Sequence, residues 1–194
     1  TKLCRDASGH DPQNPTAACI DSQSIKGSSE SGGESSGFDG GKMVKGRKRH
    51  IVTDTMGYVI GAKVHAANIP DTKMAPEVVM QDFLTFTLIR TLFADLGYQA
   101  PFRQFIKEAF GVDTETPRKE PGFKVARIRW VIERTFAWIS RQRRMSRDYE
   151  RTTQSSEIMI YISMSRIMLK QLCPVPNPWR KGEVWSPLSR VGNC

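Results

Sequence analysis

Apolar and β-branched residues form strand-like segments in the first part of the chain. ACIDSQSI at 18–25 passes from apolar to polar residues. RKRHIVTDT at 47–55 and YVIGAKVHA at 58–66 are rich in β-branched residues and are separated only by Met56-Gly57. Turn residues between two such runs are typical of an antiparallel hairpin. This part of the chain therefore predicts three strands that can pair in antiparallel fashion.

The second part of the chain alternates between helical and strand-like patterns. Pro70-Asp71-Thr72 marks the start of a helix over 72–82, and the continuous apolar run at 86–94 has the length of a buried strand. The later segments, in chain order, are a helix at 100–110, a short strand at 112–117, and helices at 124–145 and 154–172. This order predicts an α/β domain with a mixed sheet flanked by helices.

Three stretches lack a periodic apolar pattern. Residues 1–17 are interpreted as a flexible lead-in, and residues 174–194 as an irregular tail. Residues 26–41 are dominated by Gly, Ser and Glu, can bury little apolar surface, and are predicted to form a flexible loop. The remaining residues, 18–173, suffice for one domain with a buried core.

The net charge of the chain indicates which class of molecule it binds. Lys and Arg number 29 against 20 Asp and Glu, a formal net charge of +9, and the basic residues gather at 41–50 and 134–151. Such an excess favours polyanions, nucleic acid above all. Because the sequence contains neither a membrane-length apolar run nor an apolar leader at its start, it predicts a cytoplasmic protein without a membrane partner.

The cysteines and histidines are scattered along the sequence. No two cysteines form a CxxC pair, and no histidine lies at metal-ligand spacing from another candidate ligand. We therefore expect any metal ligands to be carboxylates. The residues concerned are Cys4, Cys19, Cys173, Cys194, His10, His50 and His65.

Two aspartates occupy strand positions that favour ligand binding. Asp21 follows the apolar residues 18–20, and Asp95 ends the apolar run of 86–94. Strand ends of α/β sheets open into crevices, and a carboxylate beside apolar residues is costly unless it is paired or binds a cation. Either aspartate alone is also typical of a strand-end cap or an ion-pair partner, so these alternatives stay open.

Glu133 is the third candidate. It lies beside the edge of the apolar stripe of the predicted helix, and the alternative is an i, i+4 ion pair with Arg129. Asp54 is interpreted as a turn residue, Asp71 as a helix cap, and Asp148 as neutralised by basic neighbours. Two aspartates and a glutamate are enough to hold the two divalent ions used in phosphoryl transfer, because Mg²⁺ prefers hard oxygen ligands.

Four motifs follow one another along the chain: DSQSIKG at 21–27, FDGGKMVKGRKRHIVTDTMGYVIG at 38–61, ADLGY at 94–98, and RWVIERTFAWISRQRRMSRDYE at 129–150. Together they resemble the catalytic domain of bacterial insertion-sequence DDE transposases. The resemblance extends in order from about residue 18 to 172. Several motifs in the right order are far more specific than any single carboxylate.

The resemblance implies an RNase H-like fold, with a mixed five-stranded sheet whose first three strands are antiparallel. It implies catalytic and metal-binding roles for Asp21, Asp95 and Glu133, with two Mg²⁺ or Mn²⁺ ions. The implied reaction is cleavage and strand transfer at the ends of an insertion sequence. The implied partners are the terminal inverted repeats, target DNA and a second copy of the chain, in a bacterial cytoplasm near the nucleoid, with no small-molecule cofactor.

The resemblance also implies phosphate contacts from the basic segments and leaves alternatives for the activity. Ala126 and Ser140 stand where relatives often have tyrosine and lysine, so the roles of those two positions do not carry over. Full-length relatives usually have a helical N-terminal region before the matched part, and residues 82–90 look compressed against the helix-to-strand connection of the family. The chain is therefore alternatively an inactive, truncated transposase remnant that binds DNA non-specifically. Another alternative is a nuclease that does not join strands. Trp130 and Trp138 are expected to pack rather than stack on bases. The expected DNA contacts are Lys42, Lys45, Arg47, Lys48, Arg49, Arg129, Arg141, Arg143, Arg144 and Arg147.

Overall fold

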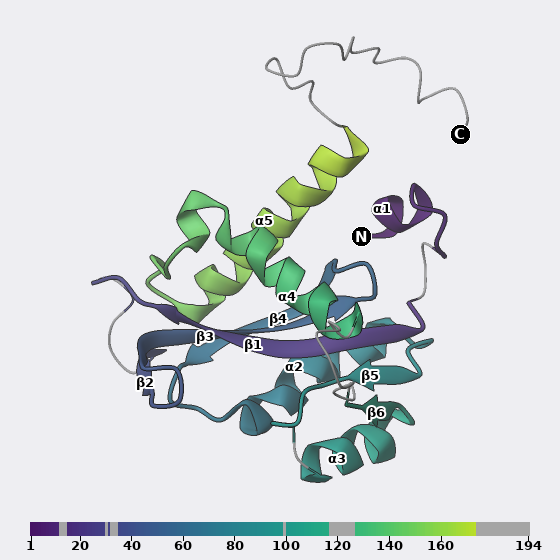
Figure 1. The fold of residues 1–194 in the computed structure, drawn as a ribbon, viewed down its shortest axis with the longest axis horizontal. Coiled ribbons are helices and arrows are strands. Elements are labelled where there is room, and N and C mark those ends of the chain that lie inside the picture. Colours follow the sequence, from purple (N-terminus) through teal and green to yellow (C-terminus); the bar gives the residue numbers. More distant parts are fainter. Residues whose placement is uncertain (12–14, 30, 32–34, 99, 117–126, 174–194) are drawn as a thin grey trace, which may run out of the picture.

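A mixed sheet with helices on both faces organises the chain in the computed structural model, which describes residues 1–11, 15–29, 31, 35–98, 100–116 and 127–173 (Figure 1). The six strands of the sheet are arranged β2-β3-β1-β5-β6, and β4 also pairs with β3. The elements are α1 (Lys2–Asp6), β1 (Ala17–Lys26), β2 (Gly37–Asp39), β3 (Val44–Asp54), β4 (Val59–Ala66), α2 (Asp71–Thr85), β5 (Thr91–Phe93), α3 (Ala100–Phe110), β6 (Asp113–Glu115), α4 (Arg127–Ser140), η2 (Arg143–Met145) and α5 (Thr153–Leu172).

The antiparallel part of the sheet confirms the predicted hairpin. β3 pairs with β4 on one side and with β1 on the other, both antiparallel. At the hairpin turn, the Asp54 carboxylate accepts hydrogen bonds from the backbone N–H groups of Met56 and Tyr58 at 2.9 Å each. Asp54 is therefore the turn residue that the sequence predicts.

The parallel part of the sheet joins segments that are far apart in the sequence. Cys19 of β1 lies opposite Phe93 of β5, which in turn lies opposite Glu115 of β6. The parallel register of β1 and β5 therefore ends at Cys19 and Phe93, although β1 continues to Lys26. Asp21 and Asp95 follow this paired register by two residues each.

Alternate residues of the strands enter two separate cores. Ala18, Ile20 and Val52 pack with residues of α2 and α3, whereas Cys19 and Ile51 pack with residues of α4 and α5. Figure 1 shows these helix pairs on opposite faces of the sheet. The α/β architecture predicted from the sequence is confirmed.

Several boundaries differ from the predictions. Lys2–Asp6 forms a helix whose buried Arg5 pairs with Asp54 at 2.7 Å. Gly37–Asp39 adds a short strand within the predicted loop. The predicted strand at 86–94 is confined to Thr91–Phe93, because the residues before it form a turn.

The long predicted helix ends at Ser140, and the basic segment that follows is a loop with one short 3-10 helix. The first residues of the predicted helix, 124–126, and the predicted tail at 174–194 lie outside the described residues. Among the described helices, none is long and apolar enough to cross a membrane.

Candidate active site

Asp21 lies in the middle of β1, and Asp95 lies two residues beyond the end of the neighbouring parallel strand β5. The parallel register of these strands ends at the pair Cys19 and Phe93, so each aspartate follows that last pair by two residues. The Asp21 carboxylate accepts a hydrogen bond from the Ser22 N–H at 2.7 Å, and Asp95 accepts one from the Gly97 N–H at 2.8 Å. Both side chains are thus oriented by the backbone that follows them.

The electrostatics of Asp21 match this proximity. The pKa of Asp21 is raised from 3.8 to about 6, mainly by burial; the Ser22 N–H and the Lys42 ammonium lower this pKa, and the Asp95 carboxylate raises it. Burial also raises the pKa of the Tyr98 hydroxyl, as do the charges of Asp21 and Asp95. A half-buried carboxylate beside another carboxylate favours a proton or a metal cation.

Glu133 is an exposed residue of α4, the helix that packs against β1. Ser140, two turns later on the same side of this helix, donates a hydrogen bond to Gln23 at 3.4 Å. Because side chains alternate along a strand, Gln23 and Asp21 belong to the same face of β1. Glu133 therefore shares a side of α4 with Ser140, whose partner Gln23 belongs to the face of β1 that carries Asp21.

The hairpin turn fixes the position of α4. The Arg134 guanidinium lies between the rings of Trp130 and Trp138, at 4.4 and 4.5 Å from their centroids, and donates to the Met56 carbonyl at 2.6 Å. The two tryptophans thus hold an arginine, and Trp130 remains 48% exposed, whereas the sequence predicted core packing.

Exposed basic residues gather where β1 ends and β3 begins. The Gly27 N–H donates to the Lys45 carbonyl at 3.3 Å, and the Ser28 N–H donates to the Asp148 carbonyl at 2.8 Å. These contacts bring together the two basic segments that were separate in the sequence. We call their exposed members the basic rim: Lys42, Lys45, Arg141, Arg143, Arg144 and Arg147.

Three of the expected phosphate contacts are buried, and that expectation is corrected for them. Arg47 is fully buried and pairs with Asp148 at 3.3 Å. Lys48 contacts Asp71 at 3.1 Å, and Arg49 donates to the Met145 carbonyl at 2.7 Å. A buried charge needs partners within the chain, so these side chains hold the scaffold beneath the rim.

Arg129 lies in the first turn of α4, and its side chain lies outside the described residues. The alternative of an Arg129–Glu133 ion pair therefore stays a prediction.

Two histidines that are isolated in the sequence are neighbours in the fold. The rings of His50 and His65 lie 5.9 Å apart between centroids, and Asp71 completes a group of possible metal ligands. These three residues are possible metal ligands in addition to the predicted carboxylates, and the expectation that the metal ligands are carboxylates stays a prediction. Cross-strand pairing creates this group, and no sequence spacing indicates it.

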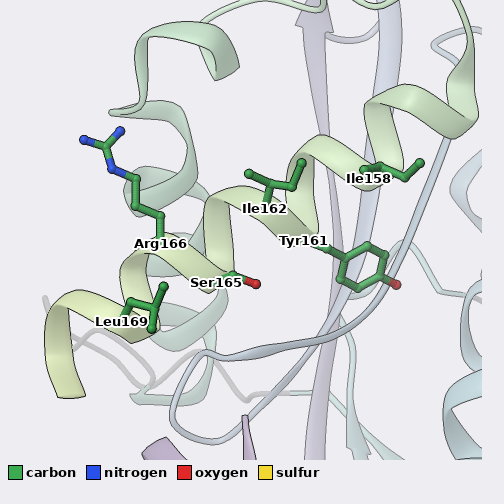
Figure 2. Close-up of a pocket in the computed structure, with 6 residues that line it drawn as sticks. All are labelled: Ile158, Tyr161, Ile162, Ser165, Arg166 and Leu169. Atoms are coloured by element: carbon green, nitrogen blue, oxygen red, sulfur yellow. The ribbon is translucent and has the colours of Figure 1, made fainter. Parts of the chain in front are cut away.

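One hollow of the surface follows α5, along side chains from Ile158 to Leu169 (Figure 2). A second lies among residues of α1, α4, α5 and the hairpin turn. Neither is lined by Asp21, Asp95 or Glu133. The two hollows are therefore separate from the carboxylates.

Comparisons with known proteins agree with the motifs. The family described as "Transposase DDE domain" matches residues 12–169. A Burkholderia cepacia protein that is named for the transposase of insertion sequence element IS402 is 30% identical over 115 residues. The match covers 55% of this chain and 54% of that protein, so the chain spans about half the length of this relative.

The fold is similar to those of retroviral integrases. A simian T-cell lymphotropic virus intasome, solved in complex with a PP2A regulatory subunit, matches with a TM-score of 0.54 and 12% identity, over 90% of this chain and 61% of that one. The catalytic core of BIV integrase matches with a TM-score of 0.45 and 12% identity, over 84% and 88%. At this identity the likeness concerns the fold, which is RNase H-like.

Proposed function

Because this chain belongs to the transposase DDE domain family, we propose that it catalyses metal-dependent cleavage and strand transfer at the ends of an insertion sequence. The observation that supports the proposal is the parallel pairing of β1 with β5, whose last pair, Cys19 and Phe93, precedes Asp21 and Asp95 by two residues each. The substrates would be terminal inverted repeats and target DNA in the bacterial cytoplasm. Two copies of the chain would bring two element ends together.

The proposed roles follow from charge and position. Asp21 and Asp95 would hold divalent cations from the strand side, and Glu133 would complete the set from α4. The raised pKa of Asp21 fits such a set, because a cation compensates two neighbouring carboxylates better than water does. When bound, two Mg²⁺ or Mn²⁺ ions activate the attacking hydroxyl and stabilise the leaving oxygen of a phosphodiester.

A cleavage assay with end-containing DNA tests these roles. Asp95→Asn and Glu133→Gln should each abolish Mg²⁺- or Mn²⁺-dependent nicking while leaving DNA affinity nearly unchanged, because both remove a ligand charge and keep the side-chain size. Asp113→Asn is the matched control, since Asp113 is an exposed acid on β6 that pairs with Lys107. Cleavage at the wild-type rate by Asp95→Asn would remove Asp95 from the mechanism.

The basic rim is proposed to bind the phosphate backbone. Arg143→Gln and Arg147→Gln should each weaken DNA binding and lower the slope of log K against log[salt] by about 1, as expected for one lost phosphate contact. Lys170→Gln, an exposed residue near the end of α5, is the control that should change neither quantity. Unchanged slopes for both arginine variants would exclude the rim as the DNA surface.

One observation favours the alternative of an inactive DNA-binding protein. Ser140 occupies a position at which relatives often have lysine, and its hydroxyl bonds Gln23 within the chain. Salt-dependent binding without nicking in either metal would support this alternative. Nicks without joined products would instead support a nuclease that does not transfer strands.

A further inference from the structure

Three potential metal ligands converge from three elements on the α2 side of the sheet. His50 belongs to β3, His65 to β4, and Asp71 is the first residue of α2. One ligand atom of each lies within 4.8 Å of the other two. Both histidines are buried, His50 at 0% and His65 at 5% exposure. An ordinary surface cluster of polar residues lacks such burial.

Each of the two histidines has one ring nitrogen that makes no hydrogen bond within the described part of the chain. His65 Nδ1 lies 3.0 Å from the Ala66 carbonyl, which can only accept, so Nδ1 carries the proton and Nε2 has a free lone pair. His65 Nε2 is buried and has no hydrogen-bond partner among the described residues. A buried polar atom without a partner is costly, and a ligand would remove that cost.

The second histidine is oriented in a similar way. Its Nε2 lies 2.7 Å from the Tyr98 hydroxyl, and its Nδ1 is buried without a hydrogen-bond partner in the described part of the chain. Outer partners of this kind fix the ring orientation of metal-bound histidines. Burial lowers the pKa of both His50 and His65, which keeps the rings in the neutral form that binds metals.

The Lys48 ammonium, which lies beside this group of residues, does not depend on Asp71 alone for a partner. The Lys48 ammonium lies 3.1 Å from Asp71, yet it also lies 3.1 Å from the Ile69 carbonyl and 3.8 Å from Asp39. Lys48 therefore keeps two partners if Asp71 turns to a metal ion. An ion central to the three ligand atoms lies no more than about 2.8 Å from each, and small side-chain shifts bring this to the zinc–nitrogen length of roughly 2.0–2.1 Å.

We propose that His50, His65 and Asp71 bind a transition-metal ion of the zinc type, at a second site separate from the aspartate pair. Two imidazoles and one carboxylate suit Zn²⁺ or Co²⁺ better than Mg²⁺, which prefers oxygen alone. The ion would tie β3, β4 and the start of α2 together. This inference does not depend on the proposed reaction.

Cobalt titration of the chelator-treated, untagged full chain tests the site. We expect visible d–d absorption that saturates at one Co²⁺ per chain in the Asp21→Asn/Asp95→Asn double variant and that is lost when Zn²⁺ displaces the Co²⁺. His65→Gln and Asp71→Asn should each lower the affinity by more than roughly 100-fold, beyond the usual cost of losing an outer-shell partner. His10→Gln, at an exposed histidine, is the matched control, and the Asp21→Asn/Asp95→Asn double variant removes binding by the carboxylate pair.

The proposal is overturned if no d–d absorption develops. It is also overturned if the absorption survives in both ligand variants, or if the Asp21→Asn/Asp95→Asn variant loses it while His65→Gln keeps it. Near-UV circular dichroism of each metal-free variant establishes that it is folded. If His65→Gln does not fold, Asp71→Asn decides, together with the rise in melting temperature that Zn²⁺ gives the wild type and the double variant. None of these readouts uses DNA, so a negative result leaves the proposed transposition reaction standing.

Discussion

Replacing Asp21 by asparagine should stabilise the metal-free protein, although it should destroy metal-dependent activity. The pKa of Asp21 is raised from 3.8 to about 6 in the folded chain, so folding disfavours its charged form. A shift of this size corresponds to at most about 3 kcal/mol of unfolding free energy. Asp21 is half-buried and water screens part of its charge, so we expect a gain of about 1–2 kcal/mol for Asp21→Asn.

The pH dependence of this gain follows from the two pKa values. Below the unfolded value of 3.8, Asp21 is protonated in both states, so Asp21→Asn and the wild type should be equally stable. The gain should grow as the pH rises through the folded value of about 6 and then stay constant. The wild type thus loses stability, relative to the variant, between pH 3.8 and about 6, because in this range its unfolded state has released the proton that its folded state still binds.

Urea unfolding in EDTA, at several pH values, measures this gain. Asp113→Asn, at an exposed aspartate, is the control and should stay within about 0.5 kcal/mol of the wild type. Added Mg²⁺ should reverse the order, because a ligand at about 100 times its Kd stabilises the wild type by about 2.7 kcal/mol. A destabilising effect of Asp21→Asn in EDTA, or a gain that does not change with pH, would refute the reasoning.

Two further predictions concern the scaffold around the site. Arg47→Met should lower the free energy of unfolding in urea by about 3–5 kcal/mol, because it leaves the buried Asp148 without its ion-pair partner. Lys45→Met, on the exposed rim, is the control and should lower it little. Equal effects of the two variants would contradict a structural role for Arg47. Gly57→Ala should lower the free energy of unfolding by about 2–3 kcal/mol, because Gly57 has φ +86° and an added Cβ would lie 2.7 Å from Thr135 Oγ1 of α4. Gly40→Ala is the control, because a Cβ at Gly40 meets open space. Equal stability of the two variants in the same assay would contradict this tight contact.

The strands and the candidate aspartates were predictable because both depend on local patterns. β-branched runs around a turn predicted the hairpin, and the apolar flank singled out Asp21, which lies within β1. The run at 86–94 predicted a strand, but the strand is confined to Thr91–Phe93. Ile89 of that run is buried although it follows a turn and lies outside the strand. The apolar pattern alone cannot distinguish such a buried turn from a buried strand.

Side chains whose environment depends on distant residues were not predictable. Arg47 and Asp148 are 101 positions apart, so local patterns show no partner for the charge of Arg47 and predict an exposed position. His50 and His65 come together only through the pairing of β3 with β4. The helix at Lys2–Asp6 is too short to be stable alone, and its buried Arg5 depends on Asp54 of the hairpin turn.

The parallel pairing of β1 with β5 has a consequence for the order of folding. The β3–β4 hairpin joins residues that are close in sequence, whereas the pairing of Cys19 with Phe93 must close a loop that contains this entire hairpin and α2. Contacts of such long range form slowly, because the entropy of closing the loop is lost before the strands pair. Asp21 and Asp95 therefore meet late, and Mg²⁺ should slow unfolding far more than it speeds refolding.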